Sequence, residues 1–247
     1  MEIIDAFCGI GPWMKRDRLL PWQPEETLQL MDHFGISKAL THSNFTAGSG
    51  GAWYGNGLLE ASAKANPRFI PAFTITPYPH ADSPQVRDYL AAMRQAQARA
   101  VWFMPLSMYP LHEMYGEILD ACVAHRLPVL WHRDTTTPAD VTKLLENWPE
   151  LRLILMGCGY MEDTWLYPLL KRYPELRICV GHFYIPADGP HRFLKEFPAE
   201  RLIFGSGLPF FSPGGLIAHL AYAQIKDSER AAILGGNMRK LMDEVRL

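Results

Sequence analysis

Three histidines lie at or just beyond the ends of short apolar segments: His42, His132 and His182. Histidine changes protonation state near neutral pH and binds transition metals, so such a group could act in acid–base catalysis or hold a metal ion. His132 is followed by Arg133 and Asp134, and the aspartate could orient the imidazole. We therefore take His132 and Asp134 as candidate catalytic residues, with Arg133 and His182 as candidates for binding an anionic group.

Aromatic and polar side chains accompany these histidines near the ends of the same segments. Small-molecule pockets are mostly apolar with a few placed polar groups, and flat apolar walls suit a planar ligand. The same side chains could instead fill an abandoned site or lie under a partner subunit. The candidate ligand-binding residues are Phe7, Asn44, Trp102, Arg133, Tyr160, His182 and Phe210.

The elements that must position these residues alternate between short apolar segments and stretches with helical periodicity. The apolar segments lack polar alternation, which is typical of parallel strands covered on both faces. The expected strands are Ile3 to Phe7, Lys38 to His42, Phe69 to Phe73, Ala100 to Met104, Pro128 to His132, Arg152 to Met156, Arg177 to Gly181 and Arg201 to Gly205. This order predicts an α/β fold in which residues 1–247 form a single (β/α)8 TIM barrel.

Helices are expected between the strands, among them Glu25 to Phe34, Leu58 to Ala65 and Ser83 to Ala98. The longest irregular stretches follow the first two strands, at Cys8 to Gln23 and Ser43 to Asn56. Long loops in compact domains are commonly functional, and both would lie at the mouth formed by the carboxyl ends of the strands. Candidate site residues and long loops thus fall at the same end of the predicted barrel.

Several motifs along the chain resemble the amidohydrolase-2 family. They occur in the family's order and cover most of the chain: Ile4-Asp5-Ala6, Gly55-Asn56, residues 66–73, residues 127–132, residues 172–176, Arg201 to Phe210, and Gly236 to Leu241. The resemblance implies the barrel fold and a hydrolase- or lyase-like activity on a small cyclic or carboxylated compound. Because one fold hosts many activities, the chemistry must still be argued from the residues.

The resemblance also implies five positions for ligands of a divalent metal. The family holds the metal with a His-x-His pair on the first strand, histidines on the fifth and sixth, and an aspartate on the eighth. The residues at these positions here are Phe7, Gly9, His132, Gly157 and Gly207. One imidazole is too few for a site that needs about three protein ligands. We therefore expect no metal and no other cofactor at these positions.

A rebuilt metal centre around His42, His132 and His182 is the main rival to this interpretation, with Cys8 and Cys158 as further donors. Ideal strand alternation places both cysteines one residue out of phase with the inward positions, so their sulfurs should face the helices. A simpler reading makes Arg133 and Asp134 loop charges and His132 a residue bonded to backbone.

Two functions therefore stay open. The chain could be an enzyme that works without the inherited metal, which we favour, or a catalytically inactive barrel that binds a small molecule or pairs with an active relative. The assays that separate them are turnover of a His132→Ala variant and co-purification with a second subunit.

Charge and composition limit the partners. The chain has 24 basic and 26 acidic side chains without clusters of one sign, which argues against nucleic acid and anionic membranes as ligands. No apolar run is long enough to cross a bilayer, and no signal sequence is evident. We expect a cytoplasmic protein with a small-molecule ligand, and the sequence leaves room for a homo-oligomer.

Overall fold

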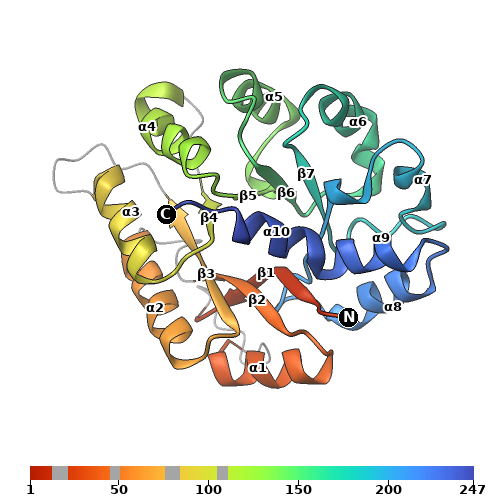
Figure 1. The fold of residues 1–247 in the computed structure, drawn as a ribbon, viewed down its shortest axis with the longest axis horizontal. Coiled ribbons are helices and arrows are strands. Elements are labelled where there is room, and N and C mark those ends of the chain that lie inside the picture. The colour runs from red at the N-terminus through yellow and green to blue at the C-terminus, as the bar shows by residue number, and fades with distance from the viewer. Residues whose placement is uncertain (13–21, 45–50, 76–83, 105–110) are drawn as a thin grey trace.

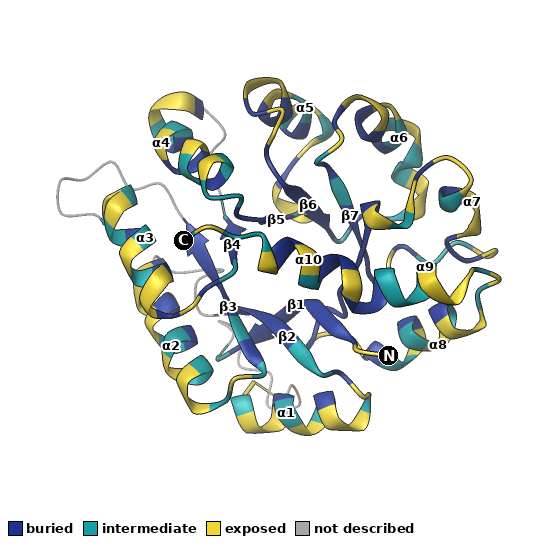
Figure 2. Cartoon of the chain, viewed as in Figure 1, coloured by how far each residue is buried: buried dark blue, intermediate teal, exposed yellow. Residues whose placement is uncertain are grey.

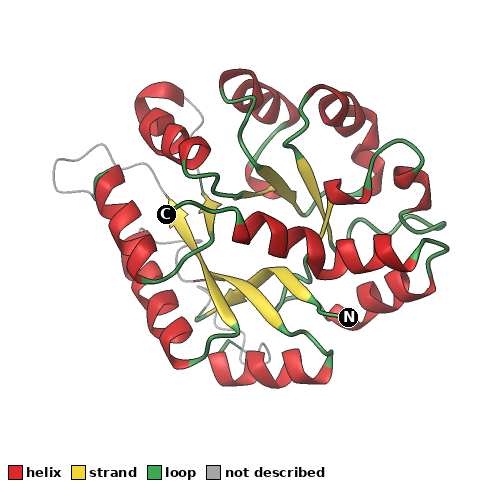
Figure 3. Ribbon diagram, in the orientation of Figure 1, coloured by secondary structure: helices red, strands yellow, loops and turns green. Residues whose placement is uncertain are grey.

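The computed structural model describes residues 1–12, 22–44, 51–75, 84–104 and 111–247. Eight parallel strands pair in chain order, as Figures 1 and 3 show. They are β1 (Ile4–Ile10), β2 (Lys38–Ser43), β3 (Phe69–Ile75), β4 (Ala100–Phe103), β5 (Val129–His132), β6 (Leu153–Met156), β7 (Arg177–Val180) and β8 (Leu202–Phe204). The segment after β8 meets β1 through two backbone hydrogen bonds, Gly207 N to Phe7 O (2.8 Å) and Gly9 N to Leu208 O (2.7 Å). The prediction of a (β/α)8 barrel is confirmed.

The helices surround this barrel (Figure 3). They are α1 (Pro24–His33), α2 (Ala52–Ala65), α3 (Val86–Gln95), α4 (Leu111–Ala124), α5 (Pro138–Asn147), α6 (Asp163–Arg172), α7 (His191–Leu194), α8 (Pro213–Tyr222), α9 (Asp227–Ala231) and α10 (Asn237–Asp243), with short turns η2 (Arg133–Thr135), η3 (Tyr160–Glu162), η4 (Ala199–Arg201) and η5 (Ala232–Gly236). Local signals set several boundaries. At α5, Thr137 and Asp140 form a capping box and Pro138 takes the first helical position. No described helix is long and apolar enough to cross a membrane.

Two predicted helix boundaries were wrong. α2 begins at Ala52, six residues before the expected start at Leu58. Within its first turns, Asn56 is buried and its side chain bonds both backbone groups of Thr74 on β3, at 2.8 and 2.9 Å. This tertiary contact outweighs the weak helix propensity of the segment. α3 ends at Gln95 rather than Ala98, because Gln97 has a φ of 53° and leaves the helical region.

The buried side chains form two layers. The inner layer fills the barrel and contains Ile4, Ala6, Phe7, Leu40, Ala72, Ala100, Trp102, Leu130, Ile154, Met156, Cys179 and Ile203. The outer layer packs the opposite strand faces against the helices, whose solvent sides are exposed in Figure 2. A register shift between Asp5 and Cys8 on β1 turns both Ala6 and Phe7 inward. Phe7 thereby reaches the barrel mouth.

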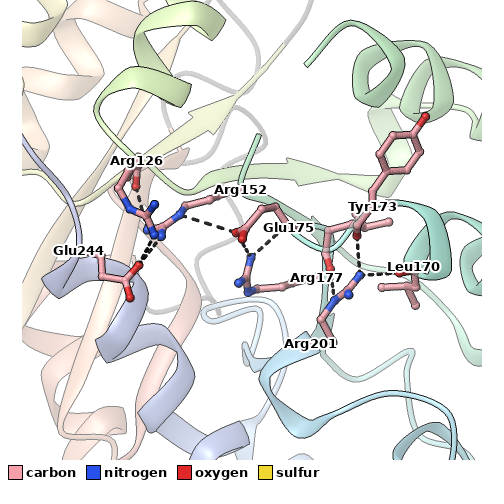
Figure 4. A network of polar contacts seen from close by, with 9 residues as sticks. Arg126, Arg152, Leu170, Tyr173, Glu175, Arg177, Arg201 and Glu244 are labelled. Carbon is pink, nitrogen blue, oxygen red and sulfur yellow. Dashed lines mark hydrogen bonds and ion pairs between the residues drawn. The ribbon is translucent and has the colours of Figure 1, made fainter. Parts of the chain in front are cut away.

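α10 crosses the opposite end of the barrel in Figure 1 and adds Met238, Leu241 and Met242 to the inner layer. A polar network ties this helix to the barrel (Figure 4). The guanidinium of Arg152, only 5% exposed, bonds Glu244 just after α10 and lies 3.7 Å from Glu175. Arg201 donates to the carbonyls of Leu176, Leu170 and Tyr173. These contacts anchor the C-terminal segment and position none of the candidate site residues.

Candidate functional site

Four rings lie against one another at the carboxyl ends of β1, β2, β4 and β5. The ring of His42 stacks on Trp102 with centroids 3.9 Å apart and planes 5° from parallel. Phe7 stacks on both, at 5.7 Å from His42 and 5.5 Å from Trp102. The imidazole of His132 lies 5.3 Å from the Phe7 ring. The structure thus brings together the candidates Phe7, Trp102 and His132 and adds His42, which the sequence pointed to only as a metal ligand.

His42 is a neutral histidine in this arrangement. Its side chain is buried, and burial lowers its pKa from 6.5 to about 3, with a smaller contribution from the nearby His132. Alternation along β2 places His42 on the same face as Leu40, which is why an imidazole at the end of this strand enters the mouth.

His132 is held in one orientation by the turn that follows it. Its Nδ1 accepts a hydrogen bond from the backbone N–H of Asp134 at 3.2 Å, so the neutral ring carries its proton on Nε2. The Asp134 carboxylate lies 3.6 Å from the same nitrogen and is 80% exposed. Burial lowers the pKa of His132 and Asp134 raises it. Asp134 therefore orients the imidazole mainly through its backbone and remains near enough to stabilise an imidazolium.

The free nitrogen of His132 faces Gly157 on the neighbouring strand. A β-carbon built at Gly157 would lie 2.6 Å from Nε2, and this glycine has a φ of 72° that disfavours other residues. The imidazole of His132 thus occupies the space that a side chain at position 157 would need, and it can lie there because this position is a glycine.

At two further positions that the family resemblance assigns to metal ligands, a neighbouring side chain occupies the space beside the glycine. A β-carbon at Gly9 would overlap the amide of Asn44, and one at Gly207 would lie 2.8 Å from the ring of Phe211. Among the residues that the structure describes, no group of three or more histidine, cysteine, aspartate or glutamate side chains could hold a metal ion. The side chains present at these five positions do not fit a divalent metal, since only His132 among them offers a donor atom.

Asn44 and Asp5 support the walls of the mouth. Asn44 is buried just after β2, donates to the carbonyl of Gly11 at 3.1 Å and leaves its side-chain oxygen without a hydrogen-bond partner. Asp5 accepts the backbone N–H groups of Phe7 (2.9 Å) and Ser206 (2.8 Å) and the Ser206 hydroxyl. Burial raises the pKa of Asp5 to about 6. Asp5 thus joins the irregular part of β1 to the loop after β8.

His182 lies in the loop after β7 among aromatic rings. Its ring centroid is 3.3 Å from that of Phe211 and 3.8 Å from that of Phe183. Its Nε2 is buried without a hydrogen-bond partner, and burial lowers its pKa, with a smaller effect of His132. Phe211, an aromatic residue that the sequence places near the mouth but that was not a candidate ligand-binding residue, occupies the space beside Gly207. Its position in a loop left no periodicity from which that contact could be inferred.

The remaining candidates lie at the edge of the mouth. Arg133 bonds Glu162 through Nε and the carbonyl of Thr136 through Nη1, and its guanidinium lies 5.6 Å from the Trp165 ring centre, so two of its three nitrogens already have partners within the protein. Tyr160 and Phe210 are exposed, at 47% and 36%. The aromatic residues Trp13 and Tyr109 and the thioether of Met108, which the sequence also places near strand ends, lie outside the described residues.

The four cysteines are buried and free. Cys8 and Cys158 pack in the outer layer between strands and helices, which confirms that their sulfurs face away from the mouth. Burial raises the pKa of both thiols far above the ordinary value. Neither is available as a metal ligand or nucleophile in this arrangement.

Comparison with known proteins places this geometry among related barrels. A family model described as amidohydrolase matches residues 14–243. No curated protein matches the chain. Among solved structures, an uncharacterised TIM-barrel protein of Bordetella bronchiseptica is 18% identical with a TM-score of 0.73, and 99% of each chain is covered.

Two further structures have named activities. A dihydroxybenzoic acid decarboxylase from Polaromonas with bound manganese and 2-nitroresorcinol is 14% identical, with a TM-score of 0.72 and coverage of 98% of this chain and 97% of that one. A probable 2-pyrone-4,6-dicarboxylic acid hydrolase from Acinetobacter baumannii is 15% identical, with a TM-score of 0.69 and coverage of 98% and 100%. At these identities the likeness shows the shared fold.

Proposed function

The chain belongs to the amidohydrolase family, and we propose that it is a lyase-like member that acts on a small carboxylated ring compound without the family's divalent metal. The observation that carries the proposal is the orientation of His132, whose Nδ1 accepts the backbone N–H of Asp134 and whose proton therefore lies on Nε2, in a ring 5.3 Å from that of Phe7. A fixed donor beside an aromatic wall suits a planar ligand with an anionic oxygen.

Absence of a bound metal in the working protein is part of this proposal. Its support is steric and chemical: Phe211 and Asn44 fill the space that side chains at Gly207 and Gly9 would need, and Phe7 offers no lone pair. Restoring the ligands would require these side chains to move. The decarboxylase of Polaromonas, by contrast, was found with manganese.

The direction of proton transfer favours a lyase over a hydrolase. Hydrolysis needs a group that takes a proton from water, but the lone pair of His132 already accepts the Asp134 N–H. Protonation of Nδ1 replaces the Asp134 N–H by the Asp134 carboxylate, 3.6 Å away, as the partner of this nitrogen, and an anionic ligand at Nε2 further favours the imidazolium.

The proposed step is a decarboxylation. The bond between the ring carbon and the carboxylate breaks, carbon dioxide leaves, and the bonding electrons stay on the ring carbon. That carbon takes the proton from Nε2 of the imidazolium, which leaves a neutral ring with its proton on Nδ1, beside the Asp134 carboxylate. Protonation of Nε2 from solvent restores the imidazolium for the next cycle. Phe7 and Trp102 would hold the ring plane during this step.

The first test is metal content measured by plasma mass spectrometry on untagged protein, before and after incubation with zinc and manganese. Turnover is then followed as carbon dioxide release from hydroxylated benzoates and pyrone carboxylates, with and without added metal. We expect substoichiometric metal and turnover that chelators do not affect. Near-stoichiometric metal that activity requires would overturn the proposal.

The variant His132→Ala tests the proton donor. We expect loss of about 10²-fold or more in kcat, as for removal of a general acid, with an unchanged melting temperature. His33→Ala, at an exposed position on α1, is the matched control. Equal turnover in the wild type and His132→Ala would exclude His132 as the donor.

A non-catalytic ligand-binding barrel is the second candidate. The observation in its favour is that Arg133, the candidate anion-binding residue, is bonded to Glu162 and Thr136, while aromatic side chains such as Phe183 and Tyr160 lie exposed at the mouth. This function predicts binding of ring carboxylates without turnover, and a second subunit that co-purifies. For either function we propose that residues 1–247 act as one domain.

A further inference from the structure

A second cavity, of about 450 Å³, opens at the end of the barrel opposite the candidate site. It lies between α10 and the first residues of β2, β3 and β4, beside the C-terminal ends of α2 and α3, a region that Figure 1 shows next to α10. α10 covers only part of this end of the barrel, and the cavity is the part left open. Its volume lies in the range of small-molecule sites.

The floor of this cavity is apolar. Ile70 lies on the inner face of β3, against the barrel core, and Met242 on α10 belongs to that core. Such surface at the bottom of a recess favours an apolar group over water, by about 0.8 kcal/mol for each methylene buried. The apolar side chains that line the cavity are those of Ala63, Pro67, Phe69, Ile70, Pro71, Ala96 and Met242.

The rim of the cavity is basic. Lys38, Lys64, Arg99 and Arg239 line it, against one acidic residue, Asp243. Lys64 pairs with Glu60 at 2.7 Å, and Arg239 pairs with Glu2, so these two charges are compensated from outside the cavity. Within the described part of the chain, Lys38 and Arg99 form no direct ion pair. The charge of Lys38 acts at longer range on Glu2, whose pKa is lowered mainly by Arg239 and to a smaller extent by Lys38.

These two cations, which form no direct ion pair, flank the same strand. Lys38 is the first residue of β2 and Arg99 directly precedes β4, on either side of β3, and both are half-buried. Partial burial beside an apolar floor weakens the hydration of these two side chains. An anion bound between them would replace the lost water contacts with charge-assisted hydrogen bonds.

We propose that this cavity binds a small organic anion, with its carboxylate or phosphate group held by Lys38 and Arg99 and its apolar body on the floor formed by Ile70 and Met242. The site is separate from the mouth and does not depend on the proposed decarboxylation. A ligand here would contact the anchored α10, and so would stabilise the folded protein.

Isothermal titration calorimetry with hexyl phosphate, hexanoate and inorganic phosphate tests the site. We expect hexyl phosphate to bind more tightly than inorganic phosphate because of its apolar chain, and the comparison with hexanoate shows which anionic group the site prefers. The variants Lys38→Met and Arg99→Met keep an apolar stem while removing the charge, and circular dichroism checks that each folds. Each should weaken binding about tenfold or more.

Two controls locate the binding. Lys171→Met removes an exposed lysine of α6 that pairs with Glu196, and His132→Ala alters the mouth. Binding should be unchanged in both. Equal affinity in the wild type, Lys38→Met and Arg99→Met would overturn the proposal, as would loss of binding in His132→Ala or no binding of any of the three probes.

Discussion

Replacing His42 by phenylalanine should make the protein more resistant to acid. The buried imidazole has its pKa lowered from 6.5 to about 3, so the folded protein keeps it neutral where the unfolded chain binds a proton. For a base with a depressed pKa, the contribution to stability is complete above pH 6.5 and is lost as the pH falls toward 3. Phenylalanine preserves the flat ring stacked on Trp102 and removes the titration.

The magnitude follows from the two pKa values. On acidification from about pH 8 to about pH 5, the titration of His42 should lower the unfolding free energy of the wild type by about 2 kcal/mol. At a pH below the folded-state pKa, the total loss should reach about 5 kcal/mol. Asp5 acts in the opposite sense, because its pKa is raised to about 6 and its carboxyl favours the folded state at lower pH. Asp5 is common to both proteins, so its effect cancels in the difference between them.

Urea denaturation at the two pH values, followed by tryptophan fluorescence and circular dichroism, measures this difference. The wild type should lose about 2 kcal/mol more than His42→Phe on acidification. The variant His33→Phe makes the same substitution at an exposed position and reports any effect of the residue change itself. Equal losses in the wild type and His42→Phe would refute the reasoning. A smaller loss in the wild type would mean that attraction between a protonated His42 and Trp102 outweighs the cost of burial.

Three further predictions concern packing and reactivity. Gly157→Ala should destabilise the protein by about 1 to 3 kcal/mol and displace the His132 ring, because Gly157 has a positive φ and the new β-carbon would lie too close to Nε2 of His132. The control Gly116→Ala, inside α4, should be neutral or stabilising. Chemical denaturation measures the change in stability, and the imidazole NMR signals report the position of the His132 ring. Asn56→Ala should cost about 2 to 4 kcal/mol in the same assay, because it removes both hydrogen bonds that the Asn56 side chain makes to the buried backbone of Thr74. The four buried cysteines should not react with a thiol reagent in the folded protein and should all react in urea, and fast labelling of the native state would contradict their burial.

Much of the fold could be predicted from the sequence because its signals are local. Each apolar segment predicted as a strand forms one in the structure. Strand alternation also correctly predicted that the side chains of Cys8 and Cys158 face the helices. The prediction failed where a distant contact decides the structure. The first turns of α2 hold Asn56 against the backbone of β3, and nothing in the surrounding residues indicates that bond. The irregular register of β1, stabilised by Asp5, has the same origin.

In the candidate site, too, single residues could be predicted from the sequence, whereas contacts between distant residues could not. The sequence identified the positions that lack metal ligands and the one imidazole that remains, because those are statements about single residues at strand ends. What fills the vacated space depends on side chains from other strands and loops: Phe211 beside Gly207 and Asn44 beside Gly9. The tautomer of His132 likewise depends on a backbone N–H two residues later, which a turn rather than a motif supplies. The glycines at the ligand positions and the side chains that occupy the space beside them therefore depend on each other. An aspartate introduced at Gly207 alone would collide with the ring of Phe211, so the variant Gly207→Asp should not bind a metal ion.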